Sequence, residues 1–143
     1  MAGRFEAREL PAEECWQLVE HSVVGRVAFV LGGRPRVFPV NIVCDGESVV
    51  FRTSSDAELA ATRDADVVVE VDGFDADRQE AWSVILTGAG RAVTGFDELA
   101  EVGRLPLFPW HAATKDLFVR VQPDAVSGRR FAAPYAGPEG FRR

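Results

Sequence analysis

The sequence predicts one domain built mainly from antiparallel β-strands that close into a small barrel. Runs rich in β-branched and aromatic residues alternate with the turn dipeptides Gly32-Gly33 and Asp45-Gly46, which is typical of an antiparallel meander. A later β-rich run contains Gly88 and Gly90, and glycines inside a strand mark bulges or bends where a barrel turns a corner. About six strands with two or three short helices are too few for a two-sheet sandwich and suit a closed barrel.

The first predicted element is a helix over residues 11–24. Pro11 suits the first helical position, and Glu13 and Glu14 favour the positive end of the helix dipole. An apolar stripe at helical spacing follows, formed by Cys15, Trp16, Val19 and Val23. Gly25 lies just beyond this stripe and is expected to help end the helix.

Three strands joined by tight turns are predicted next, at residues 27–31, 37–43 and 49–53. Pro39 lies inside the second of these runs. Because proline has no N–H to donate to a ladder, this strand is predicted to be incompletely paired, as at an edge or a bulge. The segment 55–63 is predicted to form a short helix.

The second half of the chain continues this pattern with longer loops. Further strands are predicted at 67–71, 82–93 and 117–121, and a short helix at 96–102. Loops are predicted at 74–81, which is polar, and at 105–114, which contains Pro and Trp. Residues 132–143 are predicted to be a frayed tail, and no linker or internal repeat divides residues 1–143 into more than one domain.

Composition excludes several classes of protein. The net charge is −6 and the fifteen arginines are scattered among acids, so no basic stripe is available for nucleic acid. No apolar run reaches the length of about 18 residues that a membrane span needs, and the N-terminal residues lack the apolar core of a secretory signal. Cys15 and Cys44 show no C-x-x-C spacing and are expected to be free thiols, which favours a cytoplasmic protein.

Common catalytic motifs are missing from the sequence. It contains no G-x-S-x-G, H-E-x-x-H, P-loop or G-x-G-x-x-G pattern. The two histidines, His21 and His111, lie far apart at a predicted helix end and in a loop, so neither a triad nor a metal site is predicted. No residue stands out as a general acid or base, and the catalytic residues are unknown at this level.

Three segments combine features of a binding site. Residues 52–55, Arg-Thr-Ser-Ser, place hydroxyls where a strand gives way to a helix, which suits a phosphate or, alternatively, a simple helix cap. Residues 36–41 contain Pro39 within a strand, which leaves backbone groups available to a flat heteroaromatic ligand or marks an ordinary edge strand. Trp82-Ser83 opens a strand, where the indole could be core, pocket lining or subunit interface.

In this order, these segments resemble the flavin-binding split-barrel proteins of the pyridoxamine 5'-phosphate oxidase-like family, especially its small actinobacterial members. The resemblance covers residues 10–131. It depends on seven short motifs: LPAEECW at 10–16, VGRVAF at 24–29, FPVN at 38–41, VFRT at 50–53, EVDGFD at 70–75, AWSV at 81–84 and VSGRRF at 126–131. No single motif is specific, but their order and spacing are specific for the fold.

The resemblance implies a homodimer with two FMN sites at the subunit interface. The isoalloxazine ring would lie along Arg36, Val37, Phe38, Pro39, Val40 and Asn41. The phosphate would be held by Arg52, Thr53, Ser54 and Ser55. Trp82 and Ser83 would add contacts, and Arg129 on a C-terminal strand would approach from the partner subunit.

One departure from the family pattern lies in the phosphate segment. Similar proteins carry a small hydroxyl residue and a cation where this chain has Ala57 and Glu58. The sequence therefore leaves three hypotheses open. The first is an FMN-dependent oxidoreductase, the second is a barrel that has lost flavin and acts as a binding or interaction module, and the third is a protein that uses the deazaflavin F420.

Overall fold

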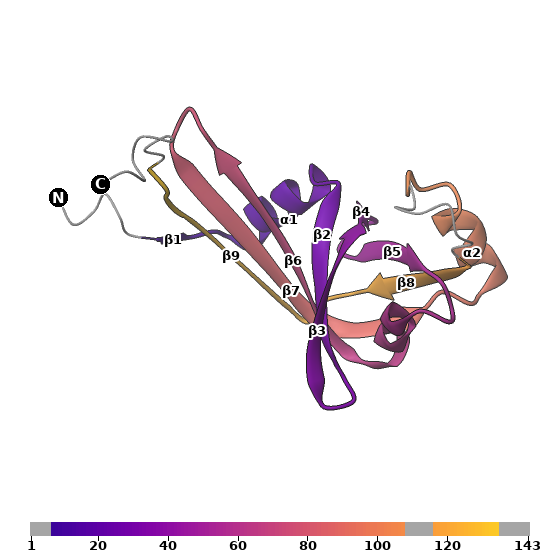
Figure 1. Ribbon diagram of the computed structural model, residues 1–143. Coiled ribbons are helices and arrows are strands. Elements are labelled where there is room, and N and C mark those ends of the chain that lie inside the picture. The colour runs from indigo at the N-terminus through magenta and orange to yellow at the C-terminus, as the bar shows by residue number, and fades with distance from the viewer. Residues whose placement is uncertain (1–6, 108–115, 135–143) are drawn as a thin grey trace.

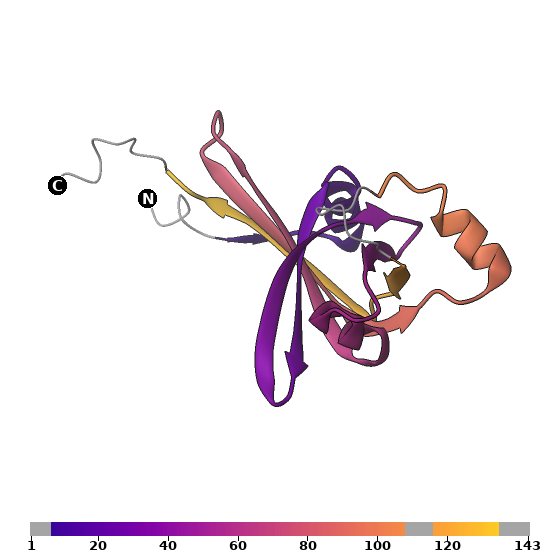
Figure 2. The ribbon, with the colours of Figure 1, turned by 45° about the vertical axis from the view of Figure 1, so that its right-hand side comes forward.

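The computed structural model describes residues 7–107 and 116–134 of the chain. In this part, short helices lie against an antiparallel sheet that folds on itself (Figures 1 and 2). The strands are β1 (Arg8–Glu9), β2 (Val24–Leu31), β3 (Arg34–Asn41), β4 (Val43–Cys44), β5 (Val49–Thr53), β6 (Asp66–Asp75), β7 (Glu80–Ala92), β8 (Leu117–Val121) and β9 (Ala125–Ala132). The helices are α1 (Ala12–Glu20), the 3₁₀ helix η2 (Glu58–Asp64) and α2 (Phe96–Val102). The fold class predicted from the sequence, a mainly antiparallel β split barrel, is confirmed.

The strands follow the order β3-β2-β6-β7-β8-β5-β4, and β9 pairs with β7 on its other side. Strand β7 belongs to two parts of the sheet, because it pairs with β6 and β9 along most of its length and with β8 at its end. The change of partner occurs at Gly88 and Gly90. A Cβ at Gly90 would overlap the carbonyl oxygen of Thr62, and a Cβ at Gly88 would lie 2.8 Å from the carbonyl oxygen of Gln122. The prediction that these glycines mark a bend is therefore confirmed.

Strands β2 and β3 form a hairpin that projects beyond the rest of the sheet (Figure 1). Its turn is Gly32-Gly33, with φ angles of 60° and 75°, in the left-handed region that favours glycine. Among the described strands, β3 pairs only with β2, and Pro39 lies opposite Arg26. The predicted edge position of Pro39 is confirmed, and the barrel is not fully closed, since β3 contacts β5 without a ladder.

The main core fills the barrel with valine, leucine and phenylalanine side chains from the inward faces of the strands. Phe29 of β2 and Phe38 of β3 stack at its edge, with ring centroids 6.0 Å apart. A smaller second core formed by Val50, Val93, Val102 and Leu107 lies under α2. Buried residues alternate with more exposed ones along β2 and over most of β6, as the period of a β-strand requires.

Helix α1 ends earlier than the sequence predicts. It covers Ala12–Glu20, whereas the predicted helix extends to residue 24. Val24 already pairs with Asn41 in the β2–β3 ladder, and Val23 is exposed, so neither valine continues the helical stripe. The Ser22 hydroxyl donates to the carbonyl oxygen of Leu18 (2.8 Å), which helps satisfy the end of the helix.

Two further expectations are corrected by the structure. The predicted loop 74–81 is mostly hairpin, because β6 continues to Asp75 and β7 begins at Glu80. The carboxylate of Asp75 accepts hydrogen bonds from the backbone N–H groups of Asp77 (3.0 Å) and Arg78 (3.1 Å) and so closes a short turn. The predicted helix 55–63 is the 3₁₀ helix η2, which begins only at Glu58.

Strand β9 extends the sheet to Ala132, where a frayed tail was predicted to begin. The rest of that tail and the Trp110-His111 loop lie outside the described residues. Midway along β9, Gly128 packs against α1, and a Cβ there would lie 2.7 Å from the Cys15 sulfur. This close approach fixes α1 on the sheet.

Candidate functional site

Strand β3 carries six of the predicted site residues, and they point to two faces. Arg36, Phe38 and Val40 alternate with the more exposed Val37 and Pro39. The Phe38 ring stacks on Phe29 and packs against the core, so this ring is not available to a ligand. The outer face and the open edge of β3 are therefore the parts of this strand available for binding.

The predicted phosphate segment lies at the end of β5. Thr53 is buried at the last rung of the β5–β8 ladder, and the Arg52 guanidinium carbon lies 4.7 Å from the centre of the Phe118 ring. Beyond the strand, Ser55 donates its backbone N–H and its hydroxyl to the two carboxylate oxygens of Asp116, each at 2.9 Å. An anion of the chain itself therefore lies at these donors.

Strand β3 and the phosphate segment are brought together by one ion pair. Arg36 Nε of β3 lies 3.6 Å from Glu58 Oε2, at the start of η2. This Nε atom is buried and has no hydrogen-bond partner among the described residues. A buried N–H donor without an acceptor is costly, so this atom suits an incoming anionic or carbonyl oxygen. Because β3 also contacts β5, which ends at Thr53, residues 36–41 and 52–55 form one region, the first group of predicted site residues.

Trp82 and Ser83 cannot line the same pocket, because neighbouring residues of a strand point to opposite faces. The Trp82 indole packs against the core and lies directly over Gly73, where a Cβ would approach it to 2.6 Å. Ser83 faces the other way and is the register partner of Arg129. These two residues line a hollow of about 470 Å³ together with Glu9, Leu10, Ile85, Val126, Ser127 and Gly128.

Within one chain, this second group lies far from the first. The order β3-β2-β6-β7 puts three strand spacings between β3 and Ser83, or roughly 14 Å along the sheet, and a fourth separates β3 from Arg129. Among the described residues, the Arg129 side chain makes no hydrogen bond or ion pair. One chain therefore does not assemble all the predicted site residues.

An exposed apolar face connects the two groups across the sheet. Val30 and Val37 are 65% and 59% exposed, although both lie in the regular β2–β3 ladder. The alternation of the strands puts them on the same outer face as Pro35, Pro39, Ala28, Val68 and Ile85. We call these seven residues the outer apolar face. Exposed apolar patches of this kind mark interaction surfaces.

A charged cluster lies beside the outer apolar face. Arg26 Nη1 lies 2.6 Å from Asp72 Oδ2 and 3.3 Å from Glu70 Oε1. Burial raises the pKa of Glu70 to about 7, and the neighbouring Asp72 carboxylate adds to this rise, although Arg26 opposes it. Glu70 is thus the group of this face whose charge changes near neutral pH.

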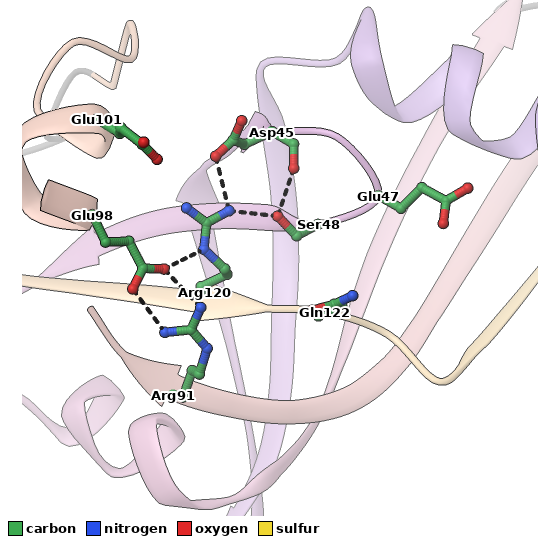
Figure 3. A pocket seen from close by; sticks show the side chains of 8 residues that line it. All are labelled: Asp45, Glu47, Ser48, Arg91, Glu98, Glu101, Arg120 and Gln122. Atoms are coloured by element: carbon green, nitrogen blue, oxygen red, sulfur yellow. Dashed lines mark hydrogen bonds and ion pairs between the residues drawn. The ribbon is translucent and has the colours of Figure 1, made fainter. Parts of the chain in front are cut away.

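The chain has a second, strongly polar pocket that the sequence patterns did not indicate (Figure 3). The buried Arg120 of β8 lies at its centre and contacts three groups: Ser48 Oγ (2.6 Å), Asp45 Oδ2 (2.9 Å) and Glu98 Oε1 (2.9 Å). Arg91 of β7 binds the Glu98 carboxylate through two further hydrogen bonds, which hold the pKa of Glu98 below its ordinary value. This network fastens α2 and the β4–β5 turn to the sheet.

Comparison with known proteins identifies the family. Residues 11–130 match the family described as Pyridoxamine 5'-phosphate oxidase. The chain belongs to this family. It is 35% identical over 140 residues to an uncharacterized protein of Mycobacterium tuberculosis, covering 93% of this chain and 91% of that one.

Solved structures of similar sequence share the same fold. The FAD binding protein from Mycobacterium smegmatis is 34% identical, with a TM-score of 0.76 over 86% of this chain and 97% of that one. A conserved protein of unknown function from Corynebacterium diphtheriae is 32% identical, with a TM-score of 0.75 over 88% of this chain and 98% of that one. The resemblance predicted from the sequence motifs is therefore confirmed at the level of family and fold.

The described residues form neither a metal-binding cluster nor a disulfide. The described residues contain no cluster of three or more His, Cys, Asp or Glu side chains able to hold a metal ion. Cys15 and Cys44 form no disulfide, and burial, with Glu20 and Asp45 nearby, raises the pKa of the Cys44 thiol to about 11. None of the described helices has the length and apolar character needed to cross a membrane.

Replacing Arg120 with Ala is expected to lower the free energy of unfolding by about 3 kcal/mol. The change leaves Asp45, Ser48 and Glu98 without the cation that they share. Urea unfolding followed by circular dichroism measures this loss. Arg91→Ala is the matched control: Arg91 also binds Glu98 but is half-exposed, and its loss is expected to cost less than about 1 kcal/mol. Equal losses of stability in the two variants would contradict the conclusion that Arg120 holds this network together.

Glu70→Gln is expected to flatten the pH dependence of stability. The folded chain binds the Glu70 proton more tightly than the unfolded chain, so the free energy of unfolding of the wild type should fall as pH rises from about 4.5 to about 7. Urea unfolding at pH values from 4.5 to 8 should show this fall, with an upper limit of about 3 kcal/mol. The fall in the free energy of unfolding should be absent in Glu70→Gln and smaller in Asp72→Asn. An unchanged pH dependence in Glu70→Gln would show that another group causes it.

Proposed function

We propose that two copies of this chain bind a flavin at their interface and that the complex is a flavin-dependent oxidoreductase. The observation that carries the proposal is the placement of the predicted binding residues in two groups that lie three to four strands apart in one sheet. A second copy packed on the outer apolar face would bring the Ser83–Arg129 hollow of one chain to the β3 edge of the other. The homodimer covers exposed valines that a lone chain would leave in water.

The residues present fit a flavin. The open edge of β3 offers backbone hydrogen-bonding groups to the rim of a planar ring, and Arg36 Nε is a buried donor without a hydrogen-bond partner among the described residues. Arg129 of the partner copy would add a cation that pairs with no acid among the described residues of its own chain. The flavin supplies the hydride chemistry when bound, and the protein holds and orients the ring and shields it from water.

Among flavins, FAD is favoured over FMN. The similar Mycobacterium smegmatis protein is described as FAD binding. In this chain, Glu58 and Asp116 put carboxylates where a terminal phosphate was predicted from the sequence. The free thiols fit a cytoplasmic protein, where flavin and reduced nicotinamide are available.

A second function has a specific observation in its favour. The same two carboxylates favour a barrel that has lost flavin and serves as a non-catalytic binding or interaction module. Titration of the purified protein with FAD, FMN, riboflavin and F420, followed by ligand fluorescence, discriminates between the two functions. Saturable binding with one flavin per chain supports the oxidoreductase, and unchanged fluorescence with all four ligands supports the module.

A further inference from the structure

The hydrogen-bond donors of Ser55 bind a carboxylate of the same chain, that of Asp116. The backbone N–H and the hydroxyl of Ser55 each donate to a different oxygen of Asp116, at 2.9 Å in both cases. These two hydrogen bonds lower the pKa of Asp116, so the carboxylate is ionised throughout the neutral range. Two donors that converge on one charged group are the arrangement by which a loop binds a phosphate.

Topology explains why Asp116 reaches this position. Thr53 pairs with Leu117 at the last rung of the β5–β8 ladder. Ser55 and Asp116 lie just beyond that rung on the two strands, where the ladder no longer occupies their backbone groups. Their contact follows from the register of the β5–β8 ladder.

A second donor in the same region also faces a carboxylate of the chain. Arg36 Nε lies 3.6 Å from Glu58 Oε2, which is an ion pair but longer than a hydrogen bond. Both side chains are more than one-third exposed, so this pair can open easily. Asp116 is held by two hydrogen bonds and is the stronger competitor for an external anion.

We propose that Asp116 is a specificity-determining residue whose carboxylate occupies the anion donors of Ser55 and excludes a ligand phosphate from them. The site then selects flavins that are held by the ring and by contacts elsewhere, and disfavours a terminal phosphate at Ser55. This inference rests on the proposed function for its ligand. The exclusion itself is a property of Ser55 and Asp116 that can be measured without flavin.

Asp116→Asn separates exclusion from a merely structural contact. Asparagine keeps the shape and an oxygen that can accept the Ser55 N–H, but it removes the charge. If the pair only closes the ladder end, the variant keeps the ligand preference of the wild type. Asp64→Asn is the matched control. Asp64 is an exposed acid of η2 that pairs with Arg63, its hydrogen bonds and ion pairs among the described residues do not include Ser55, and its substitution gives the same change in net charge.

The first experiment uses inorganic phosphate and thermal unfolding. Phosphate should raise the melting temperature of Asp116→Asn, and should have little effect on the wild type, on Asp64→Asn, or on Asp116→Asn combined with Ser55→Ala. Asp116→Ser serves as a second variant in case the asparagine disturbs the loop. Equal phosphate responses in the wild type and both Asp116 variants would overturn the inference.

The second experiment compares FMN with riboflavin, which differ only in the phosphate. Asp116→Asn should raise the affinity for FMN at least fivefold and change that for riboflavin less than twofold, as measured by flavin fluorescence. A similar gain for both ligands would overturn the inference. If every protein fails to bind flavin while Asp116→Asn responds to phosphate, the inference stands and the proposed function falls.

Discussion

Replacing Ala57 with Ser and Glu58 with Lys is expected to raise the affinity for FMN at least tenfold. The double substitution removes a carboxylate from the phosphate region, releases Arg36 from its ion pair and adds a hydroxyl and a cation. A like charge about 4 Å away costs on the order of 4 kcal/mol at the effective dielectric of a protein surface, and tenfold corresponds to only about 1.4 kcal/mol. Fluorescence titration of FMN against the wild type and the variant measures the gain.

Riboflavin is the control for this substitution, because it lacks the phosphate. Its affinity should change little, and the gain for FMN should shrink as the salt concentration rises. Glu58→Gln alone should give a smaller gain, since it removes the repulsion without adding a cation. Unchanged FMN affinity in the double variant would show that the phosphate is bound elsewhere, that Asp116 still excludes it, or that FMN is not a ligand. An equal rise for riboflavin would show an effect on the fold.

Val37→Asp is expected to weaken the proposed homodimer at least about thirtyfold and to abolish flavin binding with it. Val37 lies on the outer apolar face, and a two-fold interface would bury two unpaired carboxylates, at a cost of about 1–3 kcal/mol each. The side chain is well exposed in the single chain, so the fold itself should be little affected. Sedimentation at micromolar concentration compares the assembly states directly.

Phe96→Asp provides the matched control for the outer apolar face. Phe96 is 87% exposed at the start of α2, far from that face, and an acid suits the first turn of a helix. This variant should remain dimeric and bind flavin like the wild type. A wild-type protein that sediments as a monomer, or a Val37→Asp variant that stays dimeric, would contradict the proposed interface.

Local sequence determined most of the strands and their turns. Gly32-Gly33 predicts a hairpin because its left-handed backbone costs glycine little, and the structure has that backbone. Pro39 predicts an edge because proline cannot donate to a second ladder, and β3 is at the edge. Ala57 and Glu58 reveal the departure from the family pattern at the phosphate segment from sequence alone, because the sign of a side chain's charge is a property of the residue itself.

Boundaries that depend on competing partners were predicted less well. Val23 fits the helical stripe and Val24 ends the predicted helix, but Val24 gains a strand partner in Asn41, and a ladder across the sheet outweighs one more helical turn. Residues 74–81 are polar on average and were predicted to be a loop. Their pairing across β6 and β7 depends on the long strands that precede and follow them, which extend the ladder into a polar segment.

The sequence by itself determined the family, the β-rich fold and the segments that could meet a flavin. Only the tertiary structure decided which of these segments meet. Trp82 and Ser83 are adjacent in sequence, yet the strand period sends them to opposite faces, and the sheet order separates Ser83 from β3. The contact of Ser55 with Asp116 joins residues 61 positions apart. Such pairings depend on strand order and register, which many distant contacts fix together, so no local pattern of residues can reveal them.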